Sequence, residues 1–491
     1  MASRQYGQHS ECGRTLPTGD RRSVNRAPRG TIAAMCEPLR FYSTNRRVPA
    51  VSLAEALLQG QAADRGLFLP ERFPPLPRPE LAALRGRPYA DVAVAVLRRF
   101  TAGVFDDATL TALCGDAYDY AVPLEPVTGR CHLLRLDRGP TASFKDFAAR
   151  MMARWMGRLH DNRQRTLVIL TATSGDTGSA VAHAYFGLPG VQVVVLFPPA
   201  EVSDRQRRQM TTLGGNVTML AVDGQFDDCQ ALVKRAFADP DLRDVHLTSA
   251  NSINIGRLLP QAVYYVYAYV NLADAAGGEP VVVSVPSGNF GDMMGAVIAQ
   301  RMGVPIETLV IATNANDEVP RFLATGRYEK IAPSRVCISN AMNVGHPSNL
   351  ARLVDVYGGH LDETGTLRRP PDLAAMRRDL YAVSISDDET RATIREVYAR
   401  HRVLLEPHGA VGWAGLRHAL AERPALAGRL AISVETAHPA KFPEEIRALL
   451  GIEPDVPPSL AGLDRKPEQY ERMPAAYEPL RDLLQARFSS R

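Results

Sequence analysis

Lysine is scarce in this chain of 491 residues, since it occurs at only five positions among 57 lysines and arginines. A Walker A phosphate loop needs a lysine directly after a glycine, and no lysine in the sequence follows one, so this class of nucleotide site is excluded. The scarcity also draws attention to each lysine that is present. An amine can lose its proton and attack a carbonyl, which a guanidinium cannot do.

Paired cysteines are missing as well. The six cysteines lie far apart and form no CxxC pair, which argues against a zinc site and against a disulfide framework. A reducing compartment follows, so we expect a cytoplasmic protein. Neither a GxSxG nucleophile elbow nor an HExxH metal motif is present, and we expect no metal.

The sequence has no long apolar run and no surplus of one charge. Its most apolar stretch, LLPQAVYYVYAYVNLADAA, is interrupted by Pro260, Gln261 and Asn271 and falls short of the roughly 20 residues of a membrane span, so we expect a buried helix there. The net charge is +4, and acidic and basic residues are interspersed. Neither a membrane nor a nucleic acid is therefore an expected partner.

The N-terminal stretch differs from the rest of the chain. Residues 1–34 are rich in arginine and lack apolar periodicity, so we expect residues 1–40 to form a disordered extension. Its basic, acid-poor composition is also compatible with a targeting segment. A translation start at Met35 is a further alternative.

An α/β pattern begins near residue 166. Buried, β-branched runs such as TLVILTATSG, VQVVVLFP and PVVVSVPSG alternate with helical patterns such as FDDCQALVKRAFAD, which predicts a parallel sheet with helices on both faces. The pattern weakens over 317–380, where we expect loops near a site, and resumes after Asp387. Ligands in such folds bind beyond the carboxyl ends of the strands.

The first candidate for chemistry is Lys145, in RGPTASFKDFAARMMARWM, just ahead of a helical pattern. Its amine is a candidate nucleophile. The alternative is a surface lysine that pairs with Asp146.

Three motifs follow predicted strands. TATSGDTGSA (171–180) is a turn whose amides would favour a carboxylate or phosphate, although an ordinary turn capped by Asp176 is equally compatible. VPSGNFGD (285–292) suits a phosphate, because its glycines let backbone amides approach an anion, but it lacks the GxGxxG dinucleotide pattern. In SVETAHPAKF (433–442), Thr436 or His438 could contact a ligand, and a lone histidine there is more often a structural hydrogen-bonding group. An amine, two glycine-rich turns and a hydroxyl on one rim suit pyridoxal phosphate.

These motifs resemble those of the threonine synthase family. GPTASFKDF resembles its cofactor-lysine motif, and TATSGDTGSAVAHAYFGLP, SANSINIGRLLPQ, VSVPSGNFGD, SNAMNVGHPSN, EPHGAVG and TAHPAKF follow in the family's order. The resemblance covers about residues 41–455. It implies a fold-type-II, tryptophan-synthase-β-like α/β enzyme with a helical N-terminal domain at 41–125, a pyridoxal-phosphate-binding core of two α/β lobes at 126–455, and a C-terminal loop and helix at 456–491.

The resemblance also implies a reaction and a site. O-phospho-L-homoserine and water would give L-threonine and phosphate, by γ-elimination and β-addition of water. Lys145 would form the Schiff base and move protons, and Thr436 would face the pyridine nitrogen, leaving it largely unprotonated. The turn that binds the cofactor phosphate would consist of Gly288, Asn289, Phe290, Gly291 and Asp292.

The implied substrate contacts fall on two segments. Thr173, Ser174, Asp176 and Thr177 would receive the substrate's α-carboxylate, with Asp176 acting through a cap or hydroxyl because its charge repels. Asn251 and Ser252, at the start of an expected helix that carries Arg257, would receive the substrate phosphate. A surface ion pair of Arg257 with an acid is the alternative.

Two other functions stay open. A serine or threonine dehydratase shares the fold and the SFK lysine motif, but lacks SGDTG and the N-terminal unit. A homologue without catalysis is the other alternative, although every cofactor-motif position is intact. The assembly expected is a monomer or a homodimer.

Overall fold

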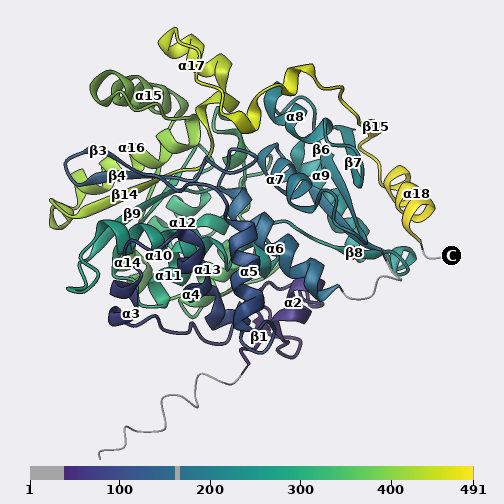
Figure 1. The fold of residues 1–491 in the computed structure, drawn as a ribbon, viewed down its shortest axis with the longest axis horizontal. Helices are drawn as coiled ribbons and strands as arrows, with labels where there is room; N and C mark the ends of the chain where they lie inside the picture. The colour runs from purple at the N-terminus through teal and green to yellow at the C-terminus, as the bar shows by residue number, and fades with distance from the viewer. Residues whose placement is uncertain (1–37, 161–165, 490–491) are drawn as a thin grey trace, which may run out of the picture. The chain divides into compact units, whose positions relative to one another are not determined.

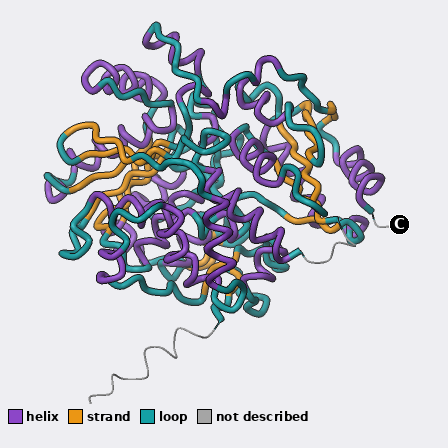
Figure 2. The backbone as a smooth tube through the Cα atoms, in the orientation of Figure 1, coloured by secondary structure: helices purple, strands orange, loops and turns teal. Residues whose placement is uncertain are grey.

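Two sheets of mostly parallel strands form the framework of the protein in the computed structural model (Figure 1), which describes residues 38–160 and 166–489. Figure 2 shows the strands gathered in two groups with helices around each. The extension predicted at residues 1–40 therefore lies almost entirely outside the described residues.

The larger sheet has six strands in the order β13-β10-β9-β14-β4-β3. All neighbouring strands in it run parallel except β3 and β4, which are antiparallel. Its strands are β3 (Leu124–Thr128), β4 (Cys131–Arg135), β9 (Val281–Pro286), β10 (Ile306–Thr313), β13 (Leu380–Ser384) and β14 (Leu430–Glu435).

The smaller sheet has five strands, all parallel, in the order β15-β7-β6-β5-β8. Its strands are β5 (Leu167–Ala172), β6 (Val191–Phe197), β7 (Val217–Asp223), β8 (His246–Thr248) and β15 (Glu471–Pro474). Two short antiparallel pairs lie outside both sheets: β1 (Phe41–Ser43) with β2 (Phe68–Pro70), and β11 (His360–Leu361) with β12 (Leu367–Arg369).

Continuous apolar runs explain the parallel strands. Every residue of β5, β9 and β14 is buried, as expected of strands that are covered by helices on both faces. The strands and helices predicted at 166–238 and 281–313 and after Asp387 are all present, and the α/β fold class is confirmed.

The helices cover the sheets and end at predictable signals. Ser203 and Gln206 form a capping box at the start of α8, and Gly451, in the left-handed region, ends α17. The described α-helices are α2 (Leu53–Gln59), α3 (Arg78–Ala83), α4 (Tyr89–Thr101), α5 (Asp107–Ala117), α6 (Lys145–Leu159), α7 (Asp176–Tyr185), α8 (Asp204–Thr211), α9 (Phe226–Ala238), α10 (Gln261–Leu272), α11 (Gly291–Arg301), α12 (Glu318–Thr325), α13 (Leu350–Val356), α14 (Leu373–Asp379), α15 (Asp387–His401), α16 (Pro407–Glu422), α17 (Pro443–Leu450) and α18 (Tyr477–Phe488).

The apolar stretch near residue 265 is the buried helix α10, as predicted, and it packs against α11 and α4. Among the described helices, none has the length and apolar character needed to cross a membrane. Helices α2 to α5 supply the helical N-terminal region, and their apolar side chains share one core cluster with α10 and α11. The domain boundary at residue 125 stays a prediction.

The C-terminal region holds more than the loop and helix predicted for 456–491. Residues 471–474 form the edge strand β15, parallel to β7, and α18 buries Leu480 and Leu484 in the cluster that covers this sheet. The segment ERMP contains a proline and buries only Met473, so its sequence carries little strand signal.

Candidate active site

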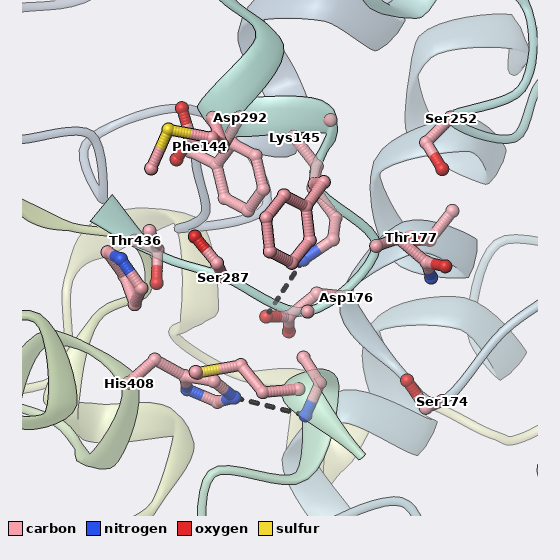
Figure 3. A pocket seen from close by; sticks show the side chains of 18 of the residues that line it. Phe144, Lys145, Ser174, Asp176, Thr177, Ser252, Ser287, Asp292, His408 and Thr436 are labelled. Carbon is pink, nitrogen blue, oxygen red and sulfur yellow. Dashed lines mark hydrogen bonds and ion pairs between the residues drawn. The ribbon is translucent and has the colours of Figure 1, made fainter. Parts of the chain in front are cut away.

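One pocket collects residues from the carboxyl ends of strands in both sheets (Figure 3). The turns after β5 and β9, the residue after β14 and the start of α6 all contribute to it, as expected for an α/β fold. Its lining consists of Phe144, Lys145, Ser174, Asp176, Thr177, Phe226, Ser252, Arg257, Gln261, Pro286, Ser287, Gly288, Asn289, Phe290, Gly291, Asp292, Met293, Ala341, Met342, His408 and Thr436.

Lys145 is the first residue of α6, and its side chain is 13% exposed. Its Nζ lies 3.8 Å from Asp176 Oδ2 and 4.4 Å from the centre of the Phe144 ring. Burial lowers the pKa of Lys145; the nearby Lys441 and Arg257 act in the same direction, and Asp176 opposes them. The alternative of a surface pair with Asp146 is wrong, because Asp146 is buried and accepts hydrogen bonds from Thr141 instead.

Asp176 begins α7 but does not cap it, because the N-cap position is Gly175. The expectation that Asp176 acts through a cap is therefore wrong. Its carboxylate is an ion-pair acceptor: Lys441 Nζ lies 2.6 Å from Oδ1, and Gln206 Nε2 donates to the same oxygen across 3.0 Å. Although burial opposes it, the two lysines hold the pKa of Asp176 well below its usual range.

The other residues of this turn divide into two groups. Ser174 and Thr177 line the pocket. Thr173 does not line it, because its Oγ1 accepts hydrogen bonds from the amides of Gly175 (2.9 Å) and Gly178 (2.7 Å). Thr173 thus shapes the turn from behind, and the predicted direct contact with a substrate is not what its position favours.

The turn after β9 brings its backbone to the pocket. Phe290 has a left-handed backbone (φ 61°) at the N-cap of α11. A Cβ on Gly288 would lie 2.9 Å from Met342 Cα, so only glycine fits between the pocket and the 341–342 segment. Glycine is therefore required here by packing, whatever the turn binds.

Asp292 lies under this turn. Tyr264 (2.5 Å) and Tyr265 (2.6 Å) donate to its Oδ1, while Oδ2 has no hydrogen-bond partner among the described residues. Burial raises the pKa of Asp292 to about 6.

Thr436 lines the pocket after β14, and its Oγ1 donates to Glu406 Oε1 (3.3 Å). Glu406 Oε2 also binds His408 Nδ1 (2.6 Å), and His408 Nε2 accepts from the Ala341 amide (3.0 Å; Figure 3). His438 does not line the pocket. Its Nδ1 accepts from the Ala440 amide, and burial lowers its pKa to about 4, so it is the structural histidine that its position favoured.

The segment 251–257 differs from the expected helix. A single 3-10 turn, Ile255–Arg257, precedes α10, so Ser252 does not begin a helix of its own; it lies beside Gly291, the first residue of α11. Ser252 and Arg257 line the pocket, whereas Asn251 lines an adjoining cleft and accepts a hydrogen bond from Thr171. Ser252 and Asn289 border both cavities, so the cleft is continuous with the pocket.

Arg257 is buried, and no carboxylate pairs with it within the described residues. Its Nη1 donates to the Ala250 carbonyl (2.7 Å), while Nε has no acceptor in the same part of the chain. The alternative of a surface ion pair is wrong. A buried cation with an unused donor beside a pocket is suited to an anion.

Several pocket residues were missed from the sequence: His408, Ser287, Phe226, Gln261, Ala341 and Met342, together with Lys441 behind Asp176. Lys441 could have been found, since the rarity of lysine that singles out Lys145 applies to it equally. The others, apart from Phe226, lie inside motifs that resemble the family's, but nothing local shows that their side chains reach the pocket, because distant segments bring them together.

The lining fits a phosphate-bearing aldehyde cofactor. A buried amine of lowered pKa, a glycine turn that a Cβ would obstruct, and a buried guanidinium with an unused donor converge on one cavity. A second anion site is required if a phosphorylated substrate also binds, and Arg257, in a different segment from the turn of Gly288, also lines the pocket.

Comparisons with known proteins agree with this arrangement. Residues 123–434 match the family described as "Pyridoxal-phosphate dependent enzyme", residues 40–118 match "Threonine synthase N terminus", and residues 409–484 match "Threonine synthase, C-terminal". A threonine synthase from Serratia marcescens is 38% identical over 91% of this chain and 99% of its own length.

Solved structures are similar too. The crystal structure of threonine synthase from Escherichia coli has a TM-score of 0.82 at 36% identity and covers 91% of this chain and 99% of its own. The PLP-bound threonine synthase from Brucella melitensis has a TM-score of 0.85 at 35% identity, with coverage of 92% and 100%. A threonine deaminase from Solanum lycopersicum, at 17% identity and a TM-score of 0.50, shares the fold alone.

Proposed function

The chain belongs to the threonine synthase family of pyridoxal-phosphate-dependent enzymes, and we propose that it converts O-phospho-L-homoserine and water into L-threonine and phosphate in the pocket around Lys145. The single observation that carries the chemistry is the buried Lys145 amine, 3.8 Å from a carboxylate and with a lowered pKa. Such an amine can bind an aldehyde and accept a proton.

Pyridoxal phosphate, when bound, supplies a ring that withdraws electrons from the amino-acid carbon next to it. Lys145 would hold it at the aldehyde, and Thr436 would face the ring nitrogen. The phosphate would accept hydrogen bonds from the turn of Gly288, Asn289, Phe290, Gly291 and Asp292, where Asp292 contributes its amide and not its carboxylate.

Lys145 Nζ is the group placed to move protons. The reaction removes phosphate from Cγ and adds water at Cβ, so protons must be exchanged at Cα, Cβ and Cγ. A single buried amine can serve all three carbons if the substrate is held in one orientation. Ser174 and Thr177 are the donors placed to orient the α-carboxylate, and Thr173 fixes their turn.

Ser252 and Arg257 are proposed to hold the substrate phosphate. The unused Nε of Arg257 supports this role, since a phosphate dianion is best held by charge-assisted donors. Asn251 belongs to the adjoining cleft and is proposed to contact phosphate as it leaves the pocket.

The location, the absence of a nucleic-acid partner and the oligomeric state are also proposals. A cytoplasmic location is supported by the free cysteines Cys114, Cys131, Cys229 and Cys337 within the described residues. Interspersed charges support a protein without a nucleic-acid partner, and we propose a monomer or a homodimer.

The test is a product assay with O-phospho-L-homoserine. Release of phosphate together with formation of L-threonine supports the proposal, whereas ammonia and a keto acid would indicate a dehydratase. Lys145→Arg should lower turnover by more than about 100-fold, because the reactive amine is lost. Lys466→Arg, an exposed position, is the matched control and should retain wild-type turnover.

A further inference from the structure

Two lysine amines share one buried carboxylate beside the pocket. Lys441 Nζ lies 2.6 Å from Asp176 Oδ1, and Lys145 Nζ lies 3.8 Å from Asp176 Oδ2 (Figure 3 shows the second contact). The Lys441 and Asp176 side chains are 0% and 2% exposed. Lys441 does not line the pocket, so it reaches the chemistry only through Asp176.

We propose that Lys441 is a positioning residue: it keeps the Asp176 carboxylate 3.8 Å from Lys145 Nζ, beyond hydrogen-bond distance, so that the Lys145 amine can give up its proton and react. The proposal rests on the proposed function only in assigning Lys145 as the reacting amine. Without Lys441, the carboxylate would have Lys145 as its nearest cation and would close the 3.8 Å gap to hydrogen-bond distance.

The surroundings hold Lys441 in this place. Its Nζ also donates to the Thr141 carbonyl (3.0 Å), and its own carbonyl accepts from Ser203 Oγ (3.1 Å). It lies at the end of the 3-10 turn Pro439–Lys441, which His438 caps. Gln206 donates to the same Asp176 oxygen as Lys441, so Oδ1 is held by two donors, while Oδ2 is the oxygen nearest Lys145.

The balance of charge favours the same arrangement. A buried carboxylate is stabilised by one nearby cation, and the charge of that cation disfavours protonation of a second amine close to it. Lys441, at the shorter distance, takes that place and leaves Lys145 as the amine that gives up its proton. The charged groups facing Lys145 are Asp176, Lys441, Arg257 and Asp292; those facing Lys441 also include Asp146, His183 and His438, and His408 faces Asp176.

The test measures the proton on Lys145 Nζ by spectroscopy. The visible absorption of the full-length holoenzyme, titrated with pH, reports the loss of this proton. Lys441→Met should raise the midpoint by about 1–3 pH units, because Asp176 then pairs with Lys145. Lys441→Arg keeps the cation and should stay within about 0.5 unit of the wild type, as should Lys466→Met at an exposed lysine.

A double variant separates positioning from loss of structure. In the Asp176→Asn background, Lys441→Met should shift the midpoint less than it does beside Asp176, since no carboxylate is left to redirect and only the direct effect of the Lys441 charge is lost. Equal shifts in both backgrounds, or no shift in either, would overturn the proposal. If Lys441→Met does not fold, Lys441→Gln, which keeps a hydrogen-bond donor but no charge, replaces it with the same expected outcomes.

The product assay distinguishes failure of the proposed function from failure of the role proposed for Lys441. A wild-type enzyme that makes no L-threonine would refute the function, while the background-dependent midpoint shift would still support the role of Lys441. Threonine formation without that shift would refute the role of Lys441 and leave the function in place.

Discussion

Thr436 Oγ1 donates to Glu406 Oε1 across 3.3 Å, and this contact joins the pocket's hydroxyl to the start of α16. Both oxygens of Glu406 are in use: Oε1 also accepts from the Gly409 amide, and Oε2 accepts from the amide and Nδ1 of His408. A carboxylate can accept all four bonds, but an amide has one acceptor oxygen.

Glu406→Gln should therefore lower the free energy of unfolding by about 1–3 kcal/mol, because its NH₂ group must face at least one buried donor. Urea denaturation of the two proteins measures this difference. Asp388→Asn replaces a fully exposed side chain on α15 and should change the same free energy by less than about 0.5 kcal/mol. Equal stability of wild type and Glu406→Gln would show that these contacts contribute little.

The strands and helices at 166–238 and 281–313 and after Asp387 could be predicted because their signals are local. β5, β9 and β14 are continuous apolar runs, and α8 and α9 begin at capping boxes. The helices and short strands between 317 and 380 were not predicted, since loops were expected there. The edge strand β15 could not be predicted, since four residues with one buried side chain form a strand only because β7 offers a free edge.

The candidate site divides in the same way. Lys145, the turn of Gly288 and Thr436 follow strands or precede a helix, so their motifs place them on the rim of the pocket. The pairing of Asp176 with Lys441 is set by the tertiary fold, and the sequence reading, which assigned Asp176 to a cap, missed it. The expected helix after Ser252 failed because Pro260 delays the start of α10.

Gly288→Ala should weaken cofactor binding. The added Cβ would lie 2.9 Å from Met342 Cα and 3.0 Å from the Ala341 carbonyl, so the turn must shift. Overpacking of this kind costs about 1–3 kcal/mol, which corresponds to a loss of affinity of about 5-fold to 150-fold. Titration of the protein with pyridoxal phosphate, followed by absorbance, measures it.

Gly115→Ala is the matched control for that substitution. A Cβ at Gly115, inside α5, meets no atom within 4 Å, so cofactor affinity should be unchanged and stability should rise by about 0.5–1 kcal/mol. Equal affinity of the Gly288→Ala variant and the wild type would show that the turn of Gly288 can move without affecting the cofactor.

Asp292 should make the stability of the protein depend on pH. Its pKa is raised from 3.8 to about 6 in the folded chain, so its favourable contribution is complete below pH 4 and is lost as pH rises through about 6. Between pH 5 and 7.5, the wild type should lose about 1–2 kcal/mol more than Asp292→Asn. Urea denaturation at both pH values, without added cofactor, measures the difference. Parallel pH dependences in the two proteins would contradict the raised pKa.

Arg257→Ala should separate substrate phosphate binding from cofactor binding. Arg257 lines the pocket and its buried Nε has no acceptor among the described residues, whereas the cofactor phosphate is assigned to the turn of Gly288. Loss of one charge-assisted contact costs about 1.5–3 kcal/mol, so kcat/KM should fall roughly tenfold to more than a hundredfold. The purified variant should keep the visible absorption of the bound cofactor.

Inorganic phosphate, as product, should compete with substrate in the wild type and much less in Arg257→Ala; initial rates at several phosphate concentrations measure this.

Arg352 is the matched contrast to Arg257, since it is also buried but donates to the carbonyls of Phe68, Ser252 and Ile253 and to the Asn349 side chain. Arg352→Ala should therefore lower the free energy of unfolding by about 3 kcal/mol or more, whereas Arg257→Ala should cost less stability. Phosphate inhibition that is unchanged in Arg257→Ala would place the substrate phosphate elsewhere in the pocket.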